Sequence, residues 1–321
     1  MKKVIVYIVF INLLLASSCT KVKEEKENVT AKTESKQKEN LNSAGVKENG
    51  HEFSVEYFKP RKIYRIEKVD LNKDGNKEII VLSAAKDTSE KYNDYYNFDL
   101  LEVFALDPEK KSYVKILSDT VDYSQDYEFA DLANDSTKQI IVKTNSGGND
   151  KTMSEGMFVY GMTPDNKVQL LKYFDTGSPE LLDIKNNGSK EILVSDLFYG
   201  VMPQNSAINF VKDIYTFENN ILVEKNSDYG EYYDNKIKDL LEKYYALKRK
   251  VEMGMQPIDL SYPLYREAAE VIVNYYAKGD LKGLKKFWDE EKESLKKNIP
   301  ADEFQDLTNF VLKALPSAKN A

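Results

Sequence analysis

The chain has 321 residues, with 46 lysines and arginines, 53 aspartates and glutamates, one histidine and one cysteine. The net charge of −7 argues against a nucleic-acid-binding protein, because such proteins usually carry a basic surface. The single cysteine excludes an intramolecular disulfide, and the single histidine, His51, argues against histidine-rich zinc sites and histidine-dependent catalytic triads.

The N-terminus has the layout of an export signal. Two lysines precede an uncharged apolar run from Val4 to Leu15, which is too short for a transmembrane helix of about 20 residues. The following segment, Leu15-Ala16-Ser17-Ser18-Cys19, resembles the lipobox of bacterial lipoproteins, although leucine is commoner than Ala16 at its position. The resemblance implies that residues 1–18 are removed and that Cys19 is lipidated. An ordinary cleaved signal with a chance cysteine is the alternative.

A polar spacer is predicted to follow the anchor. Residues 20–50 contain seven lysines, six glutamates and no aromatic residue, so they have too little apolar surface to offset the entropy of ordering. We expect a disordered linker over residues 19–51, although part of it could be a solvated helix. A flexible coil of this length would hold the folded body on the order of 30 Å from the membrane.

Residues 52–228 read as a β domain with an internal repeat. Short β-branched and aromatic runs alternate there with turn residues. Three segments align without gaps: VDLNKDGNKEIIV (69–81), ADLANDSTKQIIV (130–142) and LDIKNNGSKEILV (182–194). Their leading aspartates, at 70, 131 and 183, are 61 and 52 residues apart. Repeats of about 50 to 60 residues with four short strands are typical of β-propeller blades.

The three segments resemble FG-GAP or VCBS-type repeats of integrin-like propellers, and the resemblance covers roughly residues 60–226. It implies a propeller-like body of about three four-stranded units. Propellers usually have four to eight blades. Either the strand around residues 53–57 and the C-terminal helices complete an incomplete ring, or the sequence hides a degenerate blade.

The C-terminal region, residues 229–321, has helical periodicity. Apolar residues of its first segment, including Ile237, Leu240 and Tyr244, fall on one helical face. Further amphipathic helices are expected to begin near Ser261, after Asp280 and at Pro300. We expect a compact helical domain that packs on itself or on the edge of the β body.

The first aligned segment could bind calcium. Oxygen-bearing residues stand at every second position from its leading aspartate, and Gly75 permits a sharp turn between them. The candidate ligands are Asp70, Asn72, Asp74, the Asn76 backbone carbonyl and Glu78. The loop resembles the metal loop of FG-GAP repeats, with glutamate in place of the last aspartate. A hydrogen-bonded Asx-type turn without metal is the alternative.

The second and third copies lack part of this ligand set. Ala133 and Gln139 replace two of the oxygen donors in the second copy. In the third copy Lys185 occupies the position of Asn72, where its ammonium could replace a cation and satisfy the carboxylates itself. We expect no metal in either loop, and a structural rather than catalytic calcium ion in the first.

Function is predicted from the anchor and the repeats together. We expect a lipid-anchored protein of the cell envelope, on the extracytoplasmic side, that acts as a non-catalytic binding module for protein, peptide or glycan. Among 22 tyrosines, Tyr95 and Tyr96 are the best candidates for exposed recognition residues. The alternatives are an assembly lipoprotein that docks through its C-terminal helices and an envelope hydrolase that uses aspartate or glutamate.

Overall fold

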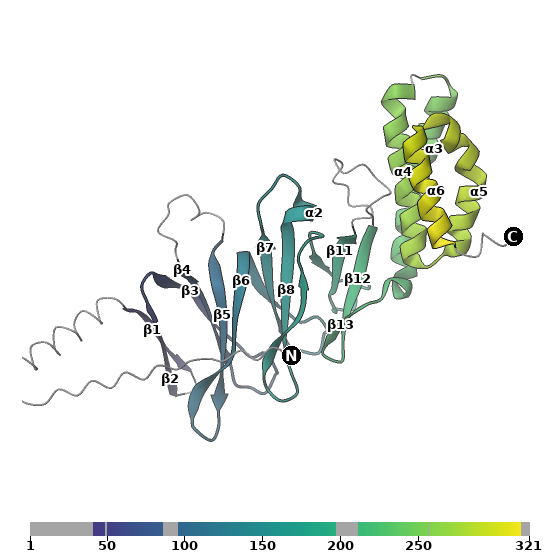
Figure 1. Ribbon diagram of the computed structural model, residues 1–321. Helices are drawn as coiled ribbons and strands as arrows, with labels where there is room; N and C mark the ends of the chain where they lie inside the picture. Colours follow the sequence, from purple (N-terminus) through teal and green to yellow (C-terminus); the bar gives the residue numbers. More distant parts are fainter. Residues whose placement is uncertain (1–40, 49, 86–95, 197–210, 256, 316–321) are drawn as a thin grey trace, which may run out of the picture.

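The computed structural model describes residues 41–48, 50–85, 96–196, 211–255 and 257–315. Strands fill the N-terminal part and helices the C-terminal part (Figure 1). The strands are β1 (Leu41–Glu48), β2 (His51–Phe58), β3 (Arg61–Val69), β4 (Glu78–Ala85), β5 (Phe98–Asp107), β6 (Ser112–Ala130), β7 (Gln139–Asn145), β8 (Glu155–Met162), β9 (Val168–Phe174), β10 (Glu180–Leu182), β11 (Glu191–Asp196), β12 (Val211–Glu218) and β13 (Ile221–Glu224). The helices are α2 (Lys151–Ser154), the 3-10 turn η1 (Asn226–Tyr229), α3 (Gly230–Glu252), α4 (Pro257–Lys278), α5 (Leu281–Asn298) and α6 (Ala301–Ala314).

Every strand pairs antiparallel with at least one strand adjacent to it in the sequence. Strands β1 and β2 form a hairpin, β3 to β9 form one sheet in sequential order, and β10 to β13 form another. Strand β6 belongs to two groups, because its first part pairs with β5 and its last part, from Ser124 to Ala130, pairs with β7. The strands therefore divide into three four-stranded meanders, β3 to early β6, late β6 to β9, and β10 to β13, which we call units 1, 2 and 3.

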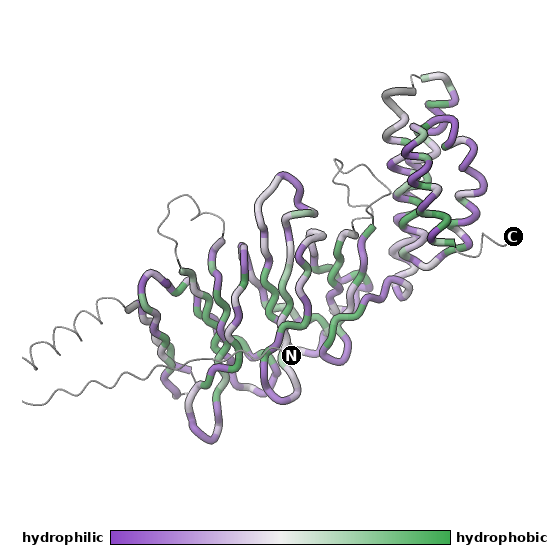
Figure 2. The backbone as a smooth tube through the Cα atoms, viewed as in Figure 1, coloured by the Kyte–Doolittle hydropathy of each residue, from purple (hydrophilic) through white to green (hydrophobic). Residues whose placement is uncertain are grey.

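The second strand of each unit is buried on both faces, which explains the continuous apolar runs of the aligned segments. Successive side chains in a strand point to opposite faces. Accordingly, Ile80 of unit 1 packs with Ile140 of unit 2, whereas Ile141 packs with Ile192 of unit 3. The units are thus stacked face to face, and Figure 2 shows apolar residues concentrated along these strands.

Different elements cover the two ends of this stack. At one end the hairpin β1–β2 packs Phe53 against Ile79, Val81 and Phe104 of unit 1. At the other end η1, α3 and α4 share an apolar cluster with unit 3, in which Leu193 contacts residues such as Tyr233. The order along the molecule is hairpin, three units and helices (Figure 1). The chain is mainly β followed by α, as predicted.

The helices also have a core of their own. Helix α4 packs against α3, α5 and α6, and the cluster includes Leu240, Tyr244, Leu264, Phe287 and Leu307. The cap predicted at Asp280 is present, since its side chain accepts a hydrogen bond from the Gly283 N–H at 2.8 Å. None of the described helices is both long enough and apolar enough to cross a membrane.

Two element boundaries differ from the sequence predictions. The predicted spacer over residues 19–51 includes β1. Alternate residues of this strand are half-buried when it pairs with β2, and its Val46 packs against the apolar cluster that the hairpin shares with unit 1. Helix α4 begins at Pro257 rather than near Ser261. Proline favours the first position of a helix, and here Pro257 takes it, while Pro263 lies within the helix.

Candidate functional site

The three aligned segments form equivalent loops. Each joins the first strand of a unit to the second, and we call them loops 1, 2 and 3 (70–78, 131–139 and 183–191), with positions counted from the leading aspartate. The backbone has positive φ at position 4 and at position 6 in all three loops. Position 6 is Gly75 in loop 1 and Gly188 in loop 3, because glycine adopts this conformation without strain.

Three side chains hold each loop in the same way. The position 5 side chain accepts the N–H of position 7, and the position 9 side chain accepts the N–H of position 2. In loop 2 these acceptors are Asp135 and Gln139, at 2.8 and 3.0 Å. The position 1 aspartate accepts the N–H of position 6 in every loop. The Asx-type turn considered from the sequence is therefore present in all three copies.

Loop 1 differs in one hydrogen bond. In loops 2 and 3 both oxygens of the position 1 aspartate accept backbone N–H groups, from positions 5 and 6. In loop 1 the N–H of Asp74 instead donates to the Asn72 side chain at 3.1 Å. Asp70 Oδ1 is left buried without a hydrogen-bond partner. A buried carboxylate oxygen without a partner is costly, and a bound cation would satisfy it.

The remaining candidate ligands of loop 1 fit calcium in part. Burial, with the nearby Asp74 and Asp70 charges, raises the pKa of Glu78 to about 7, so negative charge in this loop is poorly compensated. However, Glu78 Oε2 accepts the Leu71 N–H at 2.8 Å. Within the described ranges, no three or more histidine, cysteine, aspartate or glutamate side chains converge as a metal-binding group. Calcium binding at Asp70, Asn72, Asp74, Asn76 and Glu78 stays a prediction.

Loop 3 has a different electrostatic environment. The Lys185 ammonium lies 4.2 Å from the centroid of the Tyr229 ring and makes a cation–π contact with it. Within the described residues, Lys185 forms no ion pair with the carboxylates of the loop. The Tyr229 hydroxyl donates to Glu191 Oε1 at 2.8 Å. Tyr229 was not identified from the sequence, because its partners lie more than 35 residues away, which no local pattern encodes.

The loops are also bonded to one another in a ladder. The N–H of Lys138 in loop 2 donates to the Leu71 carbonyl of loop 1 at 2.9 Å, and the N–H of Lys190 in loop 3 repeats this contact on Leu132 of loop 2 at 3.1 Å. The position 4 side chains reach forward, since Lys73 donates to the Asp135 carbonyl and Asn134 to the Asn187 carbonyl. Loops 1, 2 and 3 therefore form consecutive rungs along one edge of the stack.

A cavity of about 500 Å³ lies at the end of this ladder. Residues 184–186 of loop 3 form one wall, and Asp228, Tyr229 and Glu231 at the start of the helical region contribute to the other. Its volume is in the range typical of ligand-binding pockets. The cavity combines one ammonium group with two carboxylates.

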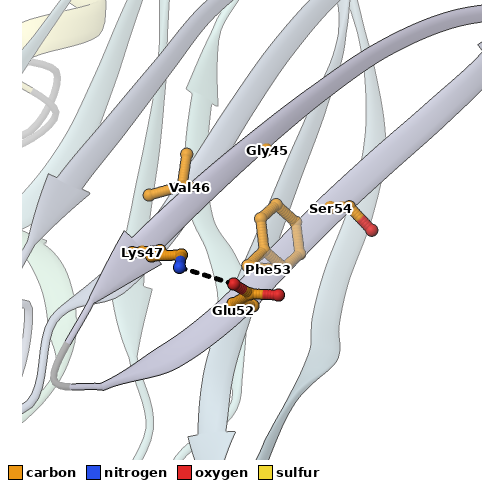
Figure 3. A pocket seen from close by; sticks show the side chains of 6 residues that line it. All are labelled: Gly45, Val46, Lys47, Glu52, Phe53 and Ser54. Carbon is orange, nitrogen blue, oxygen red and sulfur yellow. Dashed lines mark ion pairs between the residues drawn. The ribbon is translucent and has the colours of Figure 1, made fainter.

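A second cavity, of about 340 Å³, lies on the hairpin at the opposite end of the stack (Figure 3). Its lining residues are Gly45, Val46, Lys47, Glu52, Phe53 and Ser54. Lys47 and Glu52 pair with each other at 2.7 Å, and Phe53 is buried against unit 1. The cavity therefore offers less unpaired polar chemistry than the one beside loop 3.

Some predicted functional residues lie elsewhere. Residues 1–18, Cys19 and Tyr95 fall outside the described residues. Tyr96 is half-buried and donates its hydroxyl to the Ala85 carbonyl at 2.8 Å. Tyr233 and Tyr244, from two of the tyrosine pairs, are fully buried. Tyr233 and Tyr244 are therefore packing residues, and Tyr96 is not the exposed recognition residue that was expected from the sequence.

A buried polar cluster between the hairpin and unit 1 was missed by the sequence analysis. Glu102 is almost fully buried, accepts a hydrogen bond from the Tyr57 hydroxyl and pairs with Lys115. Since both carboxylate oxygens of Glu102 have partners, the cluster serves to attach the hairpin to unit 1. Its members come from three different strands, so no short motif could have revealed it.

No protein-family model matches this chain, and no curated protein sequence matches it. The resemblance to FG-GAP or VCBS-type repeats thus rests on the aligned segments alone.

Proposed function

We propose that this chain is a lipid-anchored protein on the extracytoplasmic side of a membrane of the cell envelope, where it acts as a non-catalytic binding module for protein, peptide or glycan. The lipobox-like segment ending at Cys19 supports the anchor. A repeated β body with loops along its edge supports recognition, since binding residues are often carried on loops positioned by a rigid scaffold.

The three units are proposed to be blades of an open, propeller-type array of the FG-GAP or VCBS class. The observation that carries this proposal is the face-to-face stacking of three four-stranded meanders, each with the same loop between its first and second strands. The hairpin and helices, which cover the outer faces of the first and third units, take the place of further blades.

Calcium is proposed as a structural ion of loop 1. Asp70 and Asn72 would supply side-chain oxygens together with Asp74, and the Asn76 carbonyl and Glu78 complete the candidate set. The unpartnered Asp70 oxygen supports this assignment. When bound, the ion would neutralise the clustered carboxylates and stiffen the turn.

Intact-mass analysis of the mature protein from its native host tests the anchor. We expect removal of residues 1–18 and a diacyl or triacyl modification on Cys19, and we expect Cys19→Ser to release the protein from the membrane fraction. An unmodified Cys19 on the mature chain would refute the anchor. Crosslinking on intact cells, followed by mapping of crosslinked residues, tests binding, and a body with no crosslinked partner would refute the module function.

A second candidate function is assembly through the helical domain. Met253 and Met255, in the turn after α3, are 77% and 54% exposed, and exposed methionines often serve as adaptable contacts. Deletion of the helices would expose Leu193 and Ile214 of unit 3, so point substitutions are the better test. If Met253→Ser with Met255→Ser abolishes partner crosslinking, while Leu281→Ser in the exposed first turn of α5 does not, the assembly role is favoured.

A further inference from the structure

The loop ladder ends at loop 3, where the two groups that would bond to a following loop have no such loop to bond to among the described residues. In each earlier step, the position 2 carbonyl accepts an N–H from position 8 of the next loop, and the position 4 side chain donates to the position 5 carbonyl of that loop. The corresponding groups in loop 3 are the Ile184 carbonyl and the Asn186 side chain. Within the described part of the chain, neither group makes a hydrogen bond.

Both residues line the cavity of about 500 Å³ beside loop 3. The cavity therefore occupies the place that a fourth loop would take. Helix α3 covers the apolar face of unit 3 but does not reproduce the backbone of a loop, so the edge of the ladder stays open at this point.

The charges around the cavity are complementary to a lysine, the residue expected at position 8 of a further loop. Position 8 is a lysine in all three loops, Lys77, Lys138 and Lys190. The walls of the cavity include the carboxylates of Asp228 and Glu231, whereas the Lys185 ammonium is turned onto the Tyr229 ring. Asp228 already pairs with Lys225 at 3.9 Å, whereas Glu231 has no ion pair within the described residues. A lysine whose N–H reaches the Ile184 carbonyl would therefore find the Glu231 carboxylate available for its own side chain.

We propose that this cavity binds a lysine-bearing peptide turn of a partner protein, which adds to the ladder as its fourth rung. The proposal rests on the binding-module function and names its ligand class. The lysine N–H donates to the Ile184 carbonyl, the Asn186 amide donates to a carbonyl of the turn, and the lysine side chain pairs with Glu231. Specificity comes from the turn geometry and affinity from its preorganisation.

The test uses a head-to-tail cyclic peptide of residues 130–139, because Ala130 and Gln139 are paired in the sheet and cyclisation holds the turn closed. Its control is the same peptide with an N-methyl group on the Lys138 amide, which removes the ladder donor. Binding to the soluble protein, residues 20–321, is followed by amide chemical shifts. We expect saturable shifts at residues 184–186 with the first peptide and at least about tenfold weaker binding of the second, the equivalent of 1.4 kcal/mol.

Variants of the protein sharpen the test. Asn186→Ala and Glu231→Gln should each weaken binding of the cyclic peptide several-fold, whereas Glu242→Gln, an exposed charge further along α3, should not. Equal binding of the two peptides, or no saturable shift at residues 184–186, would overturn the proposal. A partner crosslinked only to other surfaces would overturn this site but leave the module function standing. Absence of any partner on cells would remove the module function, whatever the peptide does.

Discussion

Loops 1 and 3 have the same backbone conformation, but their carboxylates have different partners. Both have positive φ at positions 4 and 6, and both use the position 9 glutamate to accept the position 2 N–H. In loop 3 the second oxygen of Glu191 accepts the Tyr229 hydroxyl, and Lys185 lies over that ring. In loop 1 Glu78 has Asp70 and Asp74 as charged neighbours, and one Asp70 oxygen has no partner.

The comparison separates what folds the loop from what gives it chemistry. Positions 1, 5 and 9 need hydrogen-bond acceptors, and Gln139 shows that position 9 needs no charge. Position 3 decides the rest. Asn72 captures the position 5 N–H and leaves a carboxylate oxygen open, whereas Ala133 and Lys185 cannot accept it, so the aspartate does.

Removal of the position 9 side chain should give the largest difference in stability between loop 1 and loop 3. Glu191→Ala leaves the Ile184 N–H and the Tyr229 hydroxyl without their acceptor in a buried site, so we expect a loss of about 3 kcal/mol in the free energy of unfolding. Glu78→Ala orphans one N–H but also removes a poorly solvated carboxylate, so its loss should be about 1 kcal/mol. Urea denaturation at pH 7 measures both, and equal losses would contradict the comparison.

The pH dependence of stability should reveal the cost of ionising Glu78 in loop 1. The pKa of Glu78 is raised from 4.5 to about 7, so the folded state holds this proton more tightly than the unfolded state. Its contribution to stability is therefore complete below pH 4.5 and is lost as the pH rises to about 7. Glu78→Gln keeps an acceptor for the Leu71 N–H and removes the cost of a buried negative charge. In chelator it should stabilise the protein by about 2 kcal/mol at pH 8 and by little near pH 4.5.

Glu191→Gln is the matched control for that substitution. A glutamine at this position can accept the Ile184 N–H but leaves the Tyr229 hydroxyl without its carboxylate acceptor, so we expect destabilisation at both pH values. The same sign of change for Glu78→Gln and Glu191→Gln would show that the two glutamates share one environment.

The smallest effect should come from Lys185. Lys185→Met removes the cation–π contact with Tyr229 but keeps much of the apolar stem, so a loss of about 0.5 kcal/mol is expected. Thermal unfolding compares this variant with Lys190→Met in the same loop. A loss above about 2 kcal/mol would mean that the ammonium also satisfies the loop carboxylates, as the sequence had suggested.

The sequence predicted the order of the parts because each part has a local pattern. The aligned segments identified three units, since every second strand must bury both faces, and helical periodicity located α3, α5 and α6. The ladder between loops could not be predicted, because its bonds join residues such as Leu71 and Lys138 across whole units. The hydrogen bond from the Asp74 N–H to Asn72 could not be predicted either, because it depends on whether the position 3 side chain is an acceptor within reach of that N–H.

Three loops with equivalent backbones differ in their chemistry, and loop 1 is the one proposed to bind a cation. Melting temperatures with millimolar calcium and with chelator test this claim most directly, on the wild type, Asp74→Ala and Asn72→Ala. We expect calcium to raise the wild-type melting temperature by about 3 °C or more, equivalent to about 1 kcal/mol, and to leave both variants unchanged. No shift in the wild type, or the same shift in all three proteins, would contradict the claim.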